Sequence, residues 1–404
     1  MVMHAQQSPP LKIVICGLGR AFVLTLPSLL KFPGIDIVGG IDPQLDTRDQ
    51  FTKTLSKPSF ASLEELHQSI AYDAVYVASP HQFHLEHVSF FLKHKKIVLC
   101  EKPMSLNMTE ALEMVRLSEA FNTPLLIGPS HSYDESILQT GRMIHQGLFG
   151  QVRMIQMLNY TDFLYRPRRS EELDSSQGGG VVYSQGAHQL DIARLLGGNL
   201  VKTITAQTGN WDPNRSTEGS YSALLKFENG CFASLTYSGY GLYDSDELCG
   251  NFSELGFQKK ELITGKAKQA LQDSLSTGLS EDVLKRKNSN LKMNQEILPP
   301  DTHEHFGMIL VSCDNADLKI MPNKLLIYET KGIREIVFTK PLIPRENVFK
   351  ELLQVWQGLP ALHDAIWGLS TMELVSGILE SAKNQSIYTT QYQSPMHLEA
   401  LLKG

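Results

Sequence analysis

The stretch KIVICGLGR, residues 12–20, decides the fold of the N-terminal part of the chain. An apolar run that ends in Gly17-Leu18-Gly19 is typical of a buried strand followed by a tight turn into a helix. Glycines let the backbone approach a pyrophosphate, which then lies at the positive end of the helix. A second apolar run, residues 37–41, ends at Asp42, whose carboxylate can accept hydrogen bonds from a ribose. This layout predicts a dinucleotide-binding Rossmann fold.

The glycine fingerprint of this fold is incomplete. The pattern G-x-G-x-x-G has a third glycine where this chain has Phe22. A strand-to-helix turn that binds no ligand is therefore the alternative. Asp42 would repel a 2′-phosphate, and Pro43, Gln44 and Leu45 after it offer no arginine to hold one. We expect NAD as the cofactor, with NADP less favoured.

Strand and helix patterns alternate through the first 130 residues. Apolar runs at 74–78, 97–100 and 125–128 are separated by helical patterns at 85–94 and 108–119. Pro27 weakens the helical pattern that follows the first glycines. The alternation predicts an α/β fold with a doubly wound parallel sheet, in which ligands bind beyond the carboxyl ends of the strands. Lys102 follows one of these ends.

The second part of the chain has hairpin patterns instead. Alternating runs at 221–227 and 231–237 flank Asn229-Gly230, and runs at 325–330 and 333–338 flank Lys331-Gly332. Strands joined by such tight turns are antiparallel. We expect a flexible tail over residues 1–10, a Rossmann domain over 11–130 and a second domain over 131–404. Residues 258–294 are polar, rich in lysine and helix-prone, and are typical of an insertion.

Composition excludes several classes of protein. A chain of 404 residues predicts two domains, and a net charge of -6 gives no electrostatic reason for binding nucleic acid or an anionic membrane. The five scattered cysteines, with no C-x-x-C, indicate reduced thiols. The N-terminus lacks a signal-peptide pattern, and no apolar run reaches the roughly 18 residues of a membrane span. We expect a cytoplasmic protein.

Four motifs together resemble the Gfo/Idh/MocA family of nicotinamide-dependent oxidoreductases. They are the turn GLGR (17–20), Ser79-Pro80 with His84 downstream, Glu101-Lys102-Pro103, and the block GGGVVYSQGAHQLD (178–191). A closer resemblance, to the phthalate 4,5-dihydrodiol dehydrogenase-like branch, rests on residues 159–174, 186–198, 208–221 and 237–248. The resemblance implies a C-terminal α+β domain with a large, mostly antiparallel sheet, and a homodimer or homotetramer.

Lys102 and His188 are the catalytic residues that the resemblance implies. Oxidation of an alcohol on NAD needs a base for the hydroxyl proton. Partial burial beside an oxidised nicotinamide would lower the pKa of Lys102, and His188 could share the proton transfer. A lone histidine is more often structural, so spacing alone does not give His188 this role. The expected cofactor contacts are Gly17, Gly19, Arg20, Asp42, Ser79, Pro80, His84, Glu101 and Lys102.

Ser184 departs from the family pattern, because many members carry an aspartate four residues before the histidine. Helical geometry would put Ser184 and His188 on one face, where the serine can bind a substrate hydroxyl but cannot raise the basicity of the imidazole. Asp191 could orient the imidazole ring and bind substrate, or pack locally. This departure favours Lys102 as the main base and places sugars and polyols second as substrates.

Three arginines, Arg166, Arg168 and Arg169, precede the glycine block. Guanidinium groups bind carboxylates bidentately, which suits a carboxylated dihydrodiol. The alternative is a solvated loop whose arginines pair with nearby acidic residues. His81, His84 and His87 repeat at a spacing of three, but no cysteine or acidic cluster accompanies them, so we expect no metal.

The expected activity is that of an NAD(P)-dependent dehydrogenase acting on a small molecule. Hydride moves between nicotinamide and a secondary alcohol of a cyclic diol, with an aromatic cis-dihydrodiol of the phthalate type as first candidate. A sugar or polyol dehydrogenase is the alternative. A nucleotide-binding regulator without catalysis is an alternative of another class, because Phe22 and Ser184 depart from the family pattern.

Overall fold

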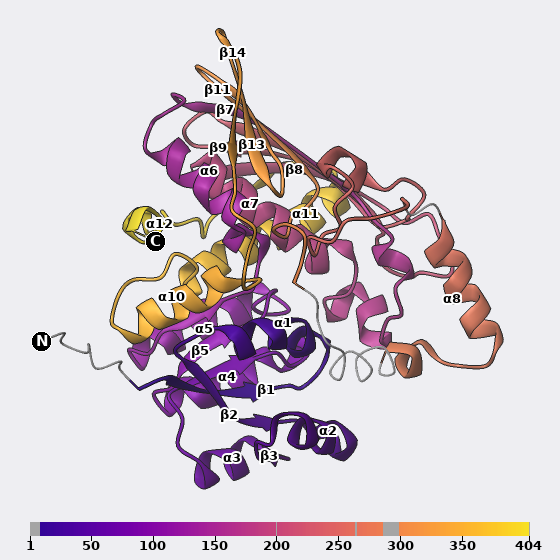
Figure 1. Cartoon of the computed structure of the whole chain (residues 1–404). Helices are drawn as coiled ribbons and strands as arrows, with labels where there is room; N and C mark the ends of the chain where they lie inside the picture. The colour runs from indigo at the N-terminus through magenta and orange to yellow at the C-terminus, as the bar shows by residue number, and fades with distance from the viewer. Residues whose placement is uncertain (1–8, 199, 263–264, 286–298, 404) are drawn as a thin grey trace, which may run out of the picture.

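Two β-sheets of different kinds organise the chain (Figure 1). The computed structural model describes residues 9–198, 200–262, 265–285 and 299–403. A six-stranded sheet formed by the first third of the chain lies in the lower part of Figure 1, and a nine-stranded sheet lies above it. The predicted α/β class is confirmed.

The six-stranded sheet is parallel throughout and has the order β3-β2-β1-β4-β5-β6. This is the predicted doubly wound arrangement. Its strands are β1 (Leu11–Cys16), β2 (Ile35–Ile41), β3 (Ser59–Phe60), β4 (Ala74–Val77), β5 (Ile97–Cys100) and β6 (Leu125–Ile127). Its helices are α1 (Arg20–Lys31), α2 (Leu45–Leu55), α3 (Leu63–Ser69), α4 (His84–Lys93) and α5 (Met108–Ala120). The two-residue strand β3 and the helices α2 and α3 had no counterpart in the predicted elements.

Helix α1 explains both irregularities of the first motif. It continues through Pro27, so the proline does not end it. Phe22, which replaces the third glycine, is fully buried, and its ring lies 5.9 Å from that of Phe51 on α2. The phenylalanine therefore fills the core between the two helices instead of closing the glycine turn.

The nine-stranded sheet has the order β14-β13-β12-β11-β7-β10-β9-β8-β15, and every pair is antiparallel except β7 with β10. The two predicted hairpins are present: β9 pairs with β10 around Asn229-Gly230, and β13 pairs with β14. The strands are β7 (Val152–Tyr160), β8 (Val201–Gly209), β9 (Ser220–Phe227), β10 (Phe232–Ser238), β11 (Met308–Cys313), β12 (Asp317–Ile320), β13 (Lys324–Glu329), β14 (Gly332–Val337) and β15 (Tyr388–Thr389).

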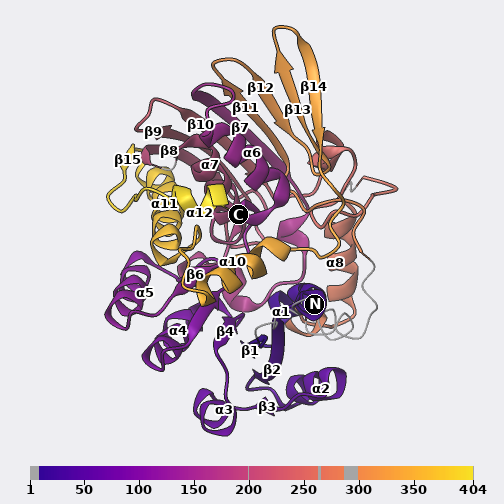
Figure 2. The same cartoon turned by 60° about the vertical axis from the view of Figure 1, so that its left-hand side comes forward.

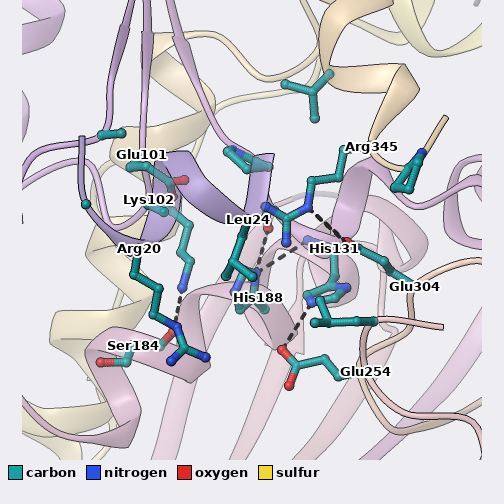
Figure 3. A pocket seen from close by; sticks show the side chains of 18 of the residues that line it. Arg20, Leu24, Glu101, Lys102, His131, Ser184, His188, Glu254, Glu304 and Arg345 are labelled. Atoms are coloured by element: carbon teal, nitrogen blue, oxygen red, sulfur yellow. Dashed lines mark hydrogen bonds and ion pairs between the residues drawn. The ribbon is translucent and has the colours of Figure 1, made fainter. Parts of the chain in front are cut away.

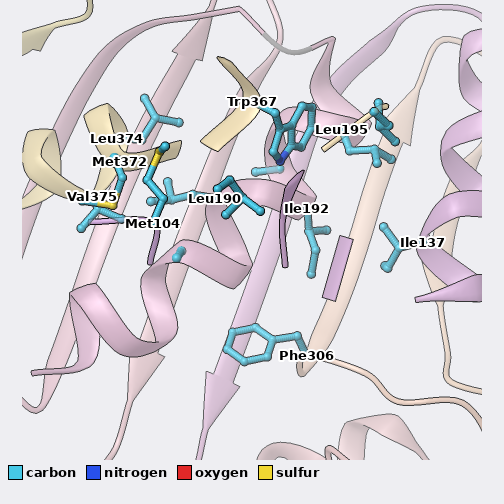
Figure 4. Packing of buried hydrophobic residues seen from close by; sticks show 14 of the residues in the cluster. Met104, Ile137, Leu190, Ile192, Leu195, Phe306, Trp367, Met372, Leu374 and Val375 are labelled. Carbon is cyan, nitrogen blue, oxygen red and sulfur yellow. The ribbon is translucent and has the colours of Figure 1, made fainter. Parts of the chain in front are cut away.

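Three helices, α6 (Glu135–His145), α7 (Ala187–Gly197) and α11 (Ala365–Asn384), pack on one face of this sheet (Figure 2). Every residue of α7 is buried. Leu190 of α7 and Val375 of α11 belong to one large cluster that also includes Met104 from the first sheet's domain (Figure 4). This shared core joins the two halves of the molecule.

Helix α10 (Glu346–Trp356) returns to the Rossmann domain. Its apolar residues Val348, Phe349, Leu352 and Val355 join the cluster that contains β1 and α1. The ring of Phe349 lies 5.5 Å from that of Phe32. A segment more than 200 residues away in sequence thus completes the first core.

The remaining elements are short. The expected insertion contains α8 (Lys266–Ser276), while residues 263–264 and 286–294 of it lie outside the described residues. Short turns and the last helix are η1 (His81–Phe83), η2 (His131–Tyr133), η3 (Phe163–Tyr165), η4 (Ser170–Leu173), η5 (Ser175–Gln177), η6 (Val182–Gly186), η7 (Ser245–Cys249) and α12 (Leu398–Lys403). Across the described ranges, no helix has both the length and the apolar character needed to cross a bilayer. The five cysteines are free thiols.

Candidate functional site

A cavity of about 1580 Å³ lies between the carboxyl end of the six-stranded sheet and the second domain. Most of the residues that the sequence singled out line it. They are Gly17, Gly19, Arg20, Asp42, Ser79, Pro80, His84, Glu101, Lys102, Arg166, Arg168, Arg169, Ser184 and His188.

The glycine turn has the geometry that a dinucleotide requires. Gly17 has φ +96°, and a Cβ there would lie 2.5 Å from the backbone nitrogen of Ser79. A Cβ on Gly19 would meet nothing within 4 Å, so this residue leaves open space. Gly19 is the N-cap of α1, and no side chain caps this helix end. The first N–H groups of α1 are therefore available to an anionic group such as a pyrophosphate.

Asp42 lies at the rim of this turn. Its carboxylate accepts hydrogen bonds from the backbone N–H groups of Leu18 (3.1 Å) and Gln44 (2.9 Å). Arg48, which the sequence reasoning did not consider, donates to the backbone carbonyls of Asp42 and Pro43 at 2.8 and 3.0 Å. The guanidinium of Arg48 is thus bound to the backbone beside Asp42.

Lys102 connects the two domains at the inner end of the cavity (Figure 3). Its Nζ donates to the backbone carbonyl of Ser184 at 2.8 Å. Burial is the main cause that lowers the pKa of Lys102, and Arg345 and Arg168 add to the effect. The preceding Glu101 accepts a hydrogen bond from the hydroxyl of Tyr76 at 2.5 Å, and burial raises the pKa of this carboxyl.

The contact with Ser184 differs from the expected one. Residues Val182–Gly186 form a π-helical turn, and α7 begins only at Ala187. The prediction that a regular helical turn joins Ser184 to His188 was therefore wrong, although both residues line the cavity. In the structure the backbone carbonyl of Ser184, not its hydroxyl, binds Lys102. A π-turn next to a reactive side chain is common at functional sites.

His188 is buried beside Lys102. Its Nδ1 lies 3.4 Å from the backbone nitrogen of His131 and 3.3 Å from the hydroxyl of Ser130. Its Nε2 has no hydrogen-bond partner among the residues that the structure describes. Burial lowers the pKa of His188 well below its ordinary value, and the positive charges of Lys102, His131 and Arg345 lower it further. The imidazole is therefore neutral at pH 7.

Sequence reasoning missed several charged residues at this site. His131 follows the carboxyl end of β6, and its Nδ1 lies 2.7 Å from Asp134. Its Nε2 lies 3.5 Å from Glu254. Arg345 donates to Glu304 (3.1 Å) and to the hydroxyl of Thr25 (2.9 Å). Ligands of a parallel sheet bind beyond the carboxyl ends of its strands, and this rule, which drew attention to Lys102, also applies to His131. No local pattern in the sequence marks Glu254, Glu304 or Arg345.

Two family models match most of the chain's first 250 residues. One, described as an oxidoreductase family with an NAD-binding Rossmann fold, matches residues 11–128, and the GFO/IDH/MocA C-terminal domain matches residues 137–249.

The chain belongs to the Gfo/Idh/MocA oxidoreductase family.

Its similarity to individual members extends over nearly the whole chain. It is 36% identical over 382 residues to 1-carboxy-3-chloro-3,4-dihydroxycyclohexa-1,5-diene dehydrogenase of Comamonas testosteroni, covering 93% of this chain and 96% of that protein. A crystal structure from Bordetella bronchiseptica RB50 has 37% identity and a TM-score of 0.87, covering 94% of this chain and all of the other. An oxidoreductase from Agrobacterium radiobacter, crystallised with NAD+, L-tartaric acid and magnesium, shares the fold at 18% identity (TM-score 0.69, covering 94% and 98%). The protein is a dehydrogenase with an NAD-binding Rossmann domain, as the resemblance predicted.

The arginine segment of this Gfo/Idh/MocA protein both lines the cavity and pairs with carboxylates. Arg166 donates to Asp162 at 2.9 Å. Arg169 lies 2.8 Å from Glu171. The guanidinium of Arg168 lies 3.6 Å from the ring centre of Phe163, and its nearest carboxylate oxygen, on Glu172, is 3.8 Å away. The pairing with nearby acidic residues is thus present, and binding of a substrate carboxylate stays a prediction.

Asp191 lies away from the cavity, which corrects its assignment as a substrate ligand or a partner of His188. Its carboxylate accepts hydrogen bonds from the indole N–H of Trp367 (3.0 Å) and from the hydroxyl of Thr371. Arg194 lies 3.9 Å from the same oxygen. Helix α7 places Asp191 against α11, where Trp367 and Thr371 bind its carboxylate. Asp191 helps to hold the two helices together.

The three spaced histidines bind protein groups separately. His84 lies within 3.1 Å of the carbonyls of Pro103 and Ser79, and burial lowers its pKa to about 4. His87 lies 2.8 Å from the hydroxyl of Ser79 and His81 lies 3.1 Å from the carbonyl of Gln177. In the described part of the chain, the group with ligand-type atoms within 4.8 Å of one another is His131, Asp134 and Glu304. An imidazole held as a cation between carboxylates has no lone pair for a metal.

Proposed function

We propose that this protein oxidises a secondary alcohol of a carboxylated cyclic diol, with an aromatic dihydrodiol as first candidate and NAD+ as hydride acceptor. The observation that carries the proposal is the shared cavity, in which Lys102 and His188 lie together and Arg166 and Arg168 form part of the wall. The Comamonas relative is named for a carboxylated dihydroxycyclohexadiene. A guanidinium wall next to a proton-accepting amine suits that class of substrate.

The cofactor would be held by Gly17, Gly19 and the uncapped start of α1, with Asp42 binding the ribose. This preference for NAD over NADP follows from the carboxylate of Asp42 and from Arg48, which is bound to backbone carbonyls. When bound, NAD+ supplies the carbon that accepts a hydride. Ser79, Pro80, His84 and Glu101 would border the nicotinamide.

Lys102 is the proposed general base. The carbinol C–H bond breaks and its electron pair leaves as hydride, while the O–H proton passes to the neutral Nζ of Lys102 and a C=O bond forms. Burial favours the neutral amine, which the reaction needs. The hydrogen bond to the Ser184 carbonyl directs Nζ into the cavity. For a dihydrodiol, the ketone product then tautomerises to an aromatic catechol, which drives the reaction forward.

Arg168 is the proposed anchor for the substrate carboxylate. Glu172 is shared between Arg168, Arg169 and Lys285, and Arg169 also pairs with Glu171. The Glu172 carboxylate lies 3.8 Å from the Arg168 guanidinium, and burial, together with Arg166 and Arg20, lowers the pKa of Arg168 to about 10. An anionic substrate group would pair with this guanidinium at a shorter distance than Glu172 does. Arg166 and Ser184 would complete the substrate site.

A second copy of the chain and a cytoplasmic location are also part of the proposal. Leu224, Phe232, Tyr328, Ile333 and Val337 are exposed on the face of the nine-stranded sheet opposite the helices. Exposed apolar residues at both ends of one sheet face favour a homodimer or homotetramer through this face. Free cysteines accord with a reducing compartment. Sedimentation of the wild type and of Val337→Lys, which we expect to dissociate, tests the assembly.

The proposed function is tested by cofactor binding followed by a substrate panel. We expect NADH to raise the melting temperature more than NADPH, since a ligand of the native state stabilises it. Carboxylated dihydrodiols, uncarboxylated dihydrodiols and polyols are then compared by the absorbance of reduced nicotinamide. Turnover of polyols alone would overturn the proposed substrate. Absence of any shift with either cofactor would favour a non-catalytic protein.

A further inference from the structure

We infer that His131 is a positioning residue that holds His188 as the neutral tautomer with its proton on Nε2, directed at the substrate oxygen. The inference rests on the proposed function for its chemical meaning, because it assigns His188 the role of a hydrogen-bond donor and leaves Lys102 as the base.

The backbone of His131 fixes the tautomer. A backbone N–H is always a donor, so Nδ1 of His188, at 3.4 Å from the nitrogen of His131, must present its lone pair. The hydroxyl of Ser130, at 3.3 Å, can donate to the same lone pair. A neutral imidazole whose Nδ1 is an acceptor carries its proton on Nε2. Within the described ranges no protein group binds this Nε2, and the ring lines the cavity.

The ring of His131 opposes a second proton on His188. The Nε2 of His131 lies 3.5 Å from Glu254 (Figure 3). Its Nδ1 lies 2.7 Å from Asp134, so both ring nitrogens face carboxylates and this ring is a cation. Burial alone would lower the pKa of His131, but these two carboxylates raise it to about 10. The two imidazole rings meet edge to face, with centres 4.7 Å apart. A fixed positive charge at this distance disfavours an imidazolium at His188.

The other charged groups that face His188 also disfavour its protonation. Lys102, after β5, and Arg345, before α10, are both basic, and both lower its pKa. Phe306 packs on the ring, with centres 4.9 Å apart, and adds no charge. On its own helix, Asp191 is bound to Trp367 and Thr371 and leaves the ring without a carboxylate partner. The surroundings therefore favour one neutral form.

This arrangement divides the chemistry between two residues. Nε2–H of His188 donates to the carbinol oxygen and to the carbonyl oxygen that replaces it, and no proton leaves the imidazole. The hydroxyl proton goes to Lys102. A serine at position 184 is consistent with this division, since a carboxylate beside His188 would stabilise the imidazolium instead.

The test combines nitrogen NMR with kinetics on the full-length protein. Protein labelled with 15N-histidine is recorded between pH 5 and 9, and His188→Gln identifies the signals of His188. We expect the wild type to show protonated Nε2, unprotonated Nδ1 and no titration in this range. In His131→Asn, which can still donate to Asp134 but carries no charge, the pKa of His188 should rise by about one unit or more, about tenfold in proton affinity. The pH profile of kcat should then lose activity at its acidic end, while KM for NAD+ changes little.

Two further variants keep the result interpretable. His131→Gln is a second variant that removes the charge of this ring and should raise the pKa of His188 in the same way, which serves if His131→Asn folds poorly. His94→Asn replaces an exposed histidine and should change neither readout. A wild-type His188 that titrates near its ordinary pKa, or that carries the proton on Nδ1, overturns the inference. So does a His131→Asn protein whose His188 signals and pH profile match those of the wild type. The NMR needs no substrate, so failure of the dihydrodiol proposal alone leaves its outcome unaffected.

Discussion

The Nζ of Lys102 donates to the backbone carbonyl of Ser184 across the boundary between the two domains, at 2.8 Å. The lysine follows a strand of the first sheet, and the carbonyl belongs to the π-helical turn that precedes His188. The direction of the amine is therefore set by the packing of the two domains on each other. The shared core around Met104 and Val375 holds this packing in place.

Removal of the lysine amine tests its role as base. Lys102→Ala should lower kcat by about 10² to 10⁴ fold, the usual contribution of a general base. Affinity for NADH should change by no more than about threefold, because the glycine turn and Asp42 are untouched. Steady-state kinetics and NADH titration measure the two effects, with exposed Lys53→Ala as control. Unchanged turnover would remove Lys102 from the mechanism.

The pH dependence of oxidation should report the same amine. Only the neutral form accepts a proton, so kcat/KM is low below the pKa of Lys102 and rises with pH until that pKa is passed. Burial, Arg345 and Arg168 lower this pKa, so the plateau should begin below the ordinary lysine value of about 10.4. A profile of kcat/KM measured from pH 6 to 10.5 shows the pH at which kcat/KM stops rising. A rate that still climbs at the upper limit contradicts a buried lysine base.

Local patterns predicted the first domain well because its signals are local. Turn glycines, apolar runs and strand ends marked every strand except β3, and they located Gly17, Asp42 and Lys102 at one edge of the sheet. The failures have tertiary causes. The π-turn at Ser184 breaks the regular helical spacing, and α10 joins the first core only through folding.

The charged partners at the site show the same limit. Glu254 and Arg345 reach the cavity from connections of the second domain, so their neighbours in sequence give no sign of their neighbours in space. Asp191 was misplaced for a related reason: its distance in sequence from His188 says nothing of the Trp367 indole that binds it. His131 follows the carboxyl end of a predicted strand and could have been identified in the same way as Lys102.

We expect Arg168 to bind the carboxylate of the substrate. Arg168→Gln should raise KM for a carboxylated dihydrodiol by about 10 to 100 fold, the value of a charge-assisted hydrogen bond. KM for the uncarboxylated dihydrodiol should stay within about twofold. Arg153→Gln is the matched control, because Arg153 is a surface arginine of β7 that pairs with Asp314. Equal losses on both substrates would show that Arg168 supports the loop and does not bind the carboxylate.

The charge of His131 should also contribute to stability in a pH-dependent way. The folded protein raises the pKa of His131 from 6.5 to about 10, so this contribution is complete below pH 6.5 and is lost as the pH rises through about 10. His131→Asn should therefore melt well below the wild type at pH 7, and the difference should shrink toward pH 10. Calorimetry at the two pH values measures it. A constant difference would mean that the ring packs without its charge.

Substitutions at Gly17 and Gly19 should affect different properties, the first the stability of the fold and the second the affinity for the cofactor. At Gly17, φ is +96° and a Cβ would lie 2.5 Å from the Ser79 backbone, so Gly17→Ala should unfold at a clearly lower temperature even without cofactor. At Gly19 a Cβ meets nothing within 4 Å, and Gly19→Ala should melt within about 2 °C of the wild type. The added methyl would instead occupy the space where a pyrophosphate approaches, so NADH affinity should fall about tenfold or more. Melting curves with and without NADH distinguish the two effects. Full NADH binding by Gly19→Ala would show that the cofactor does not pass over this turn.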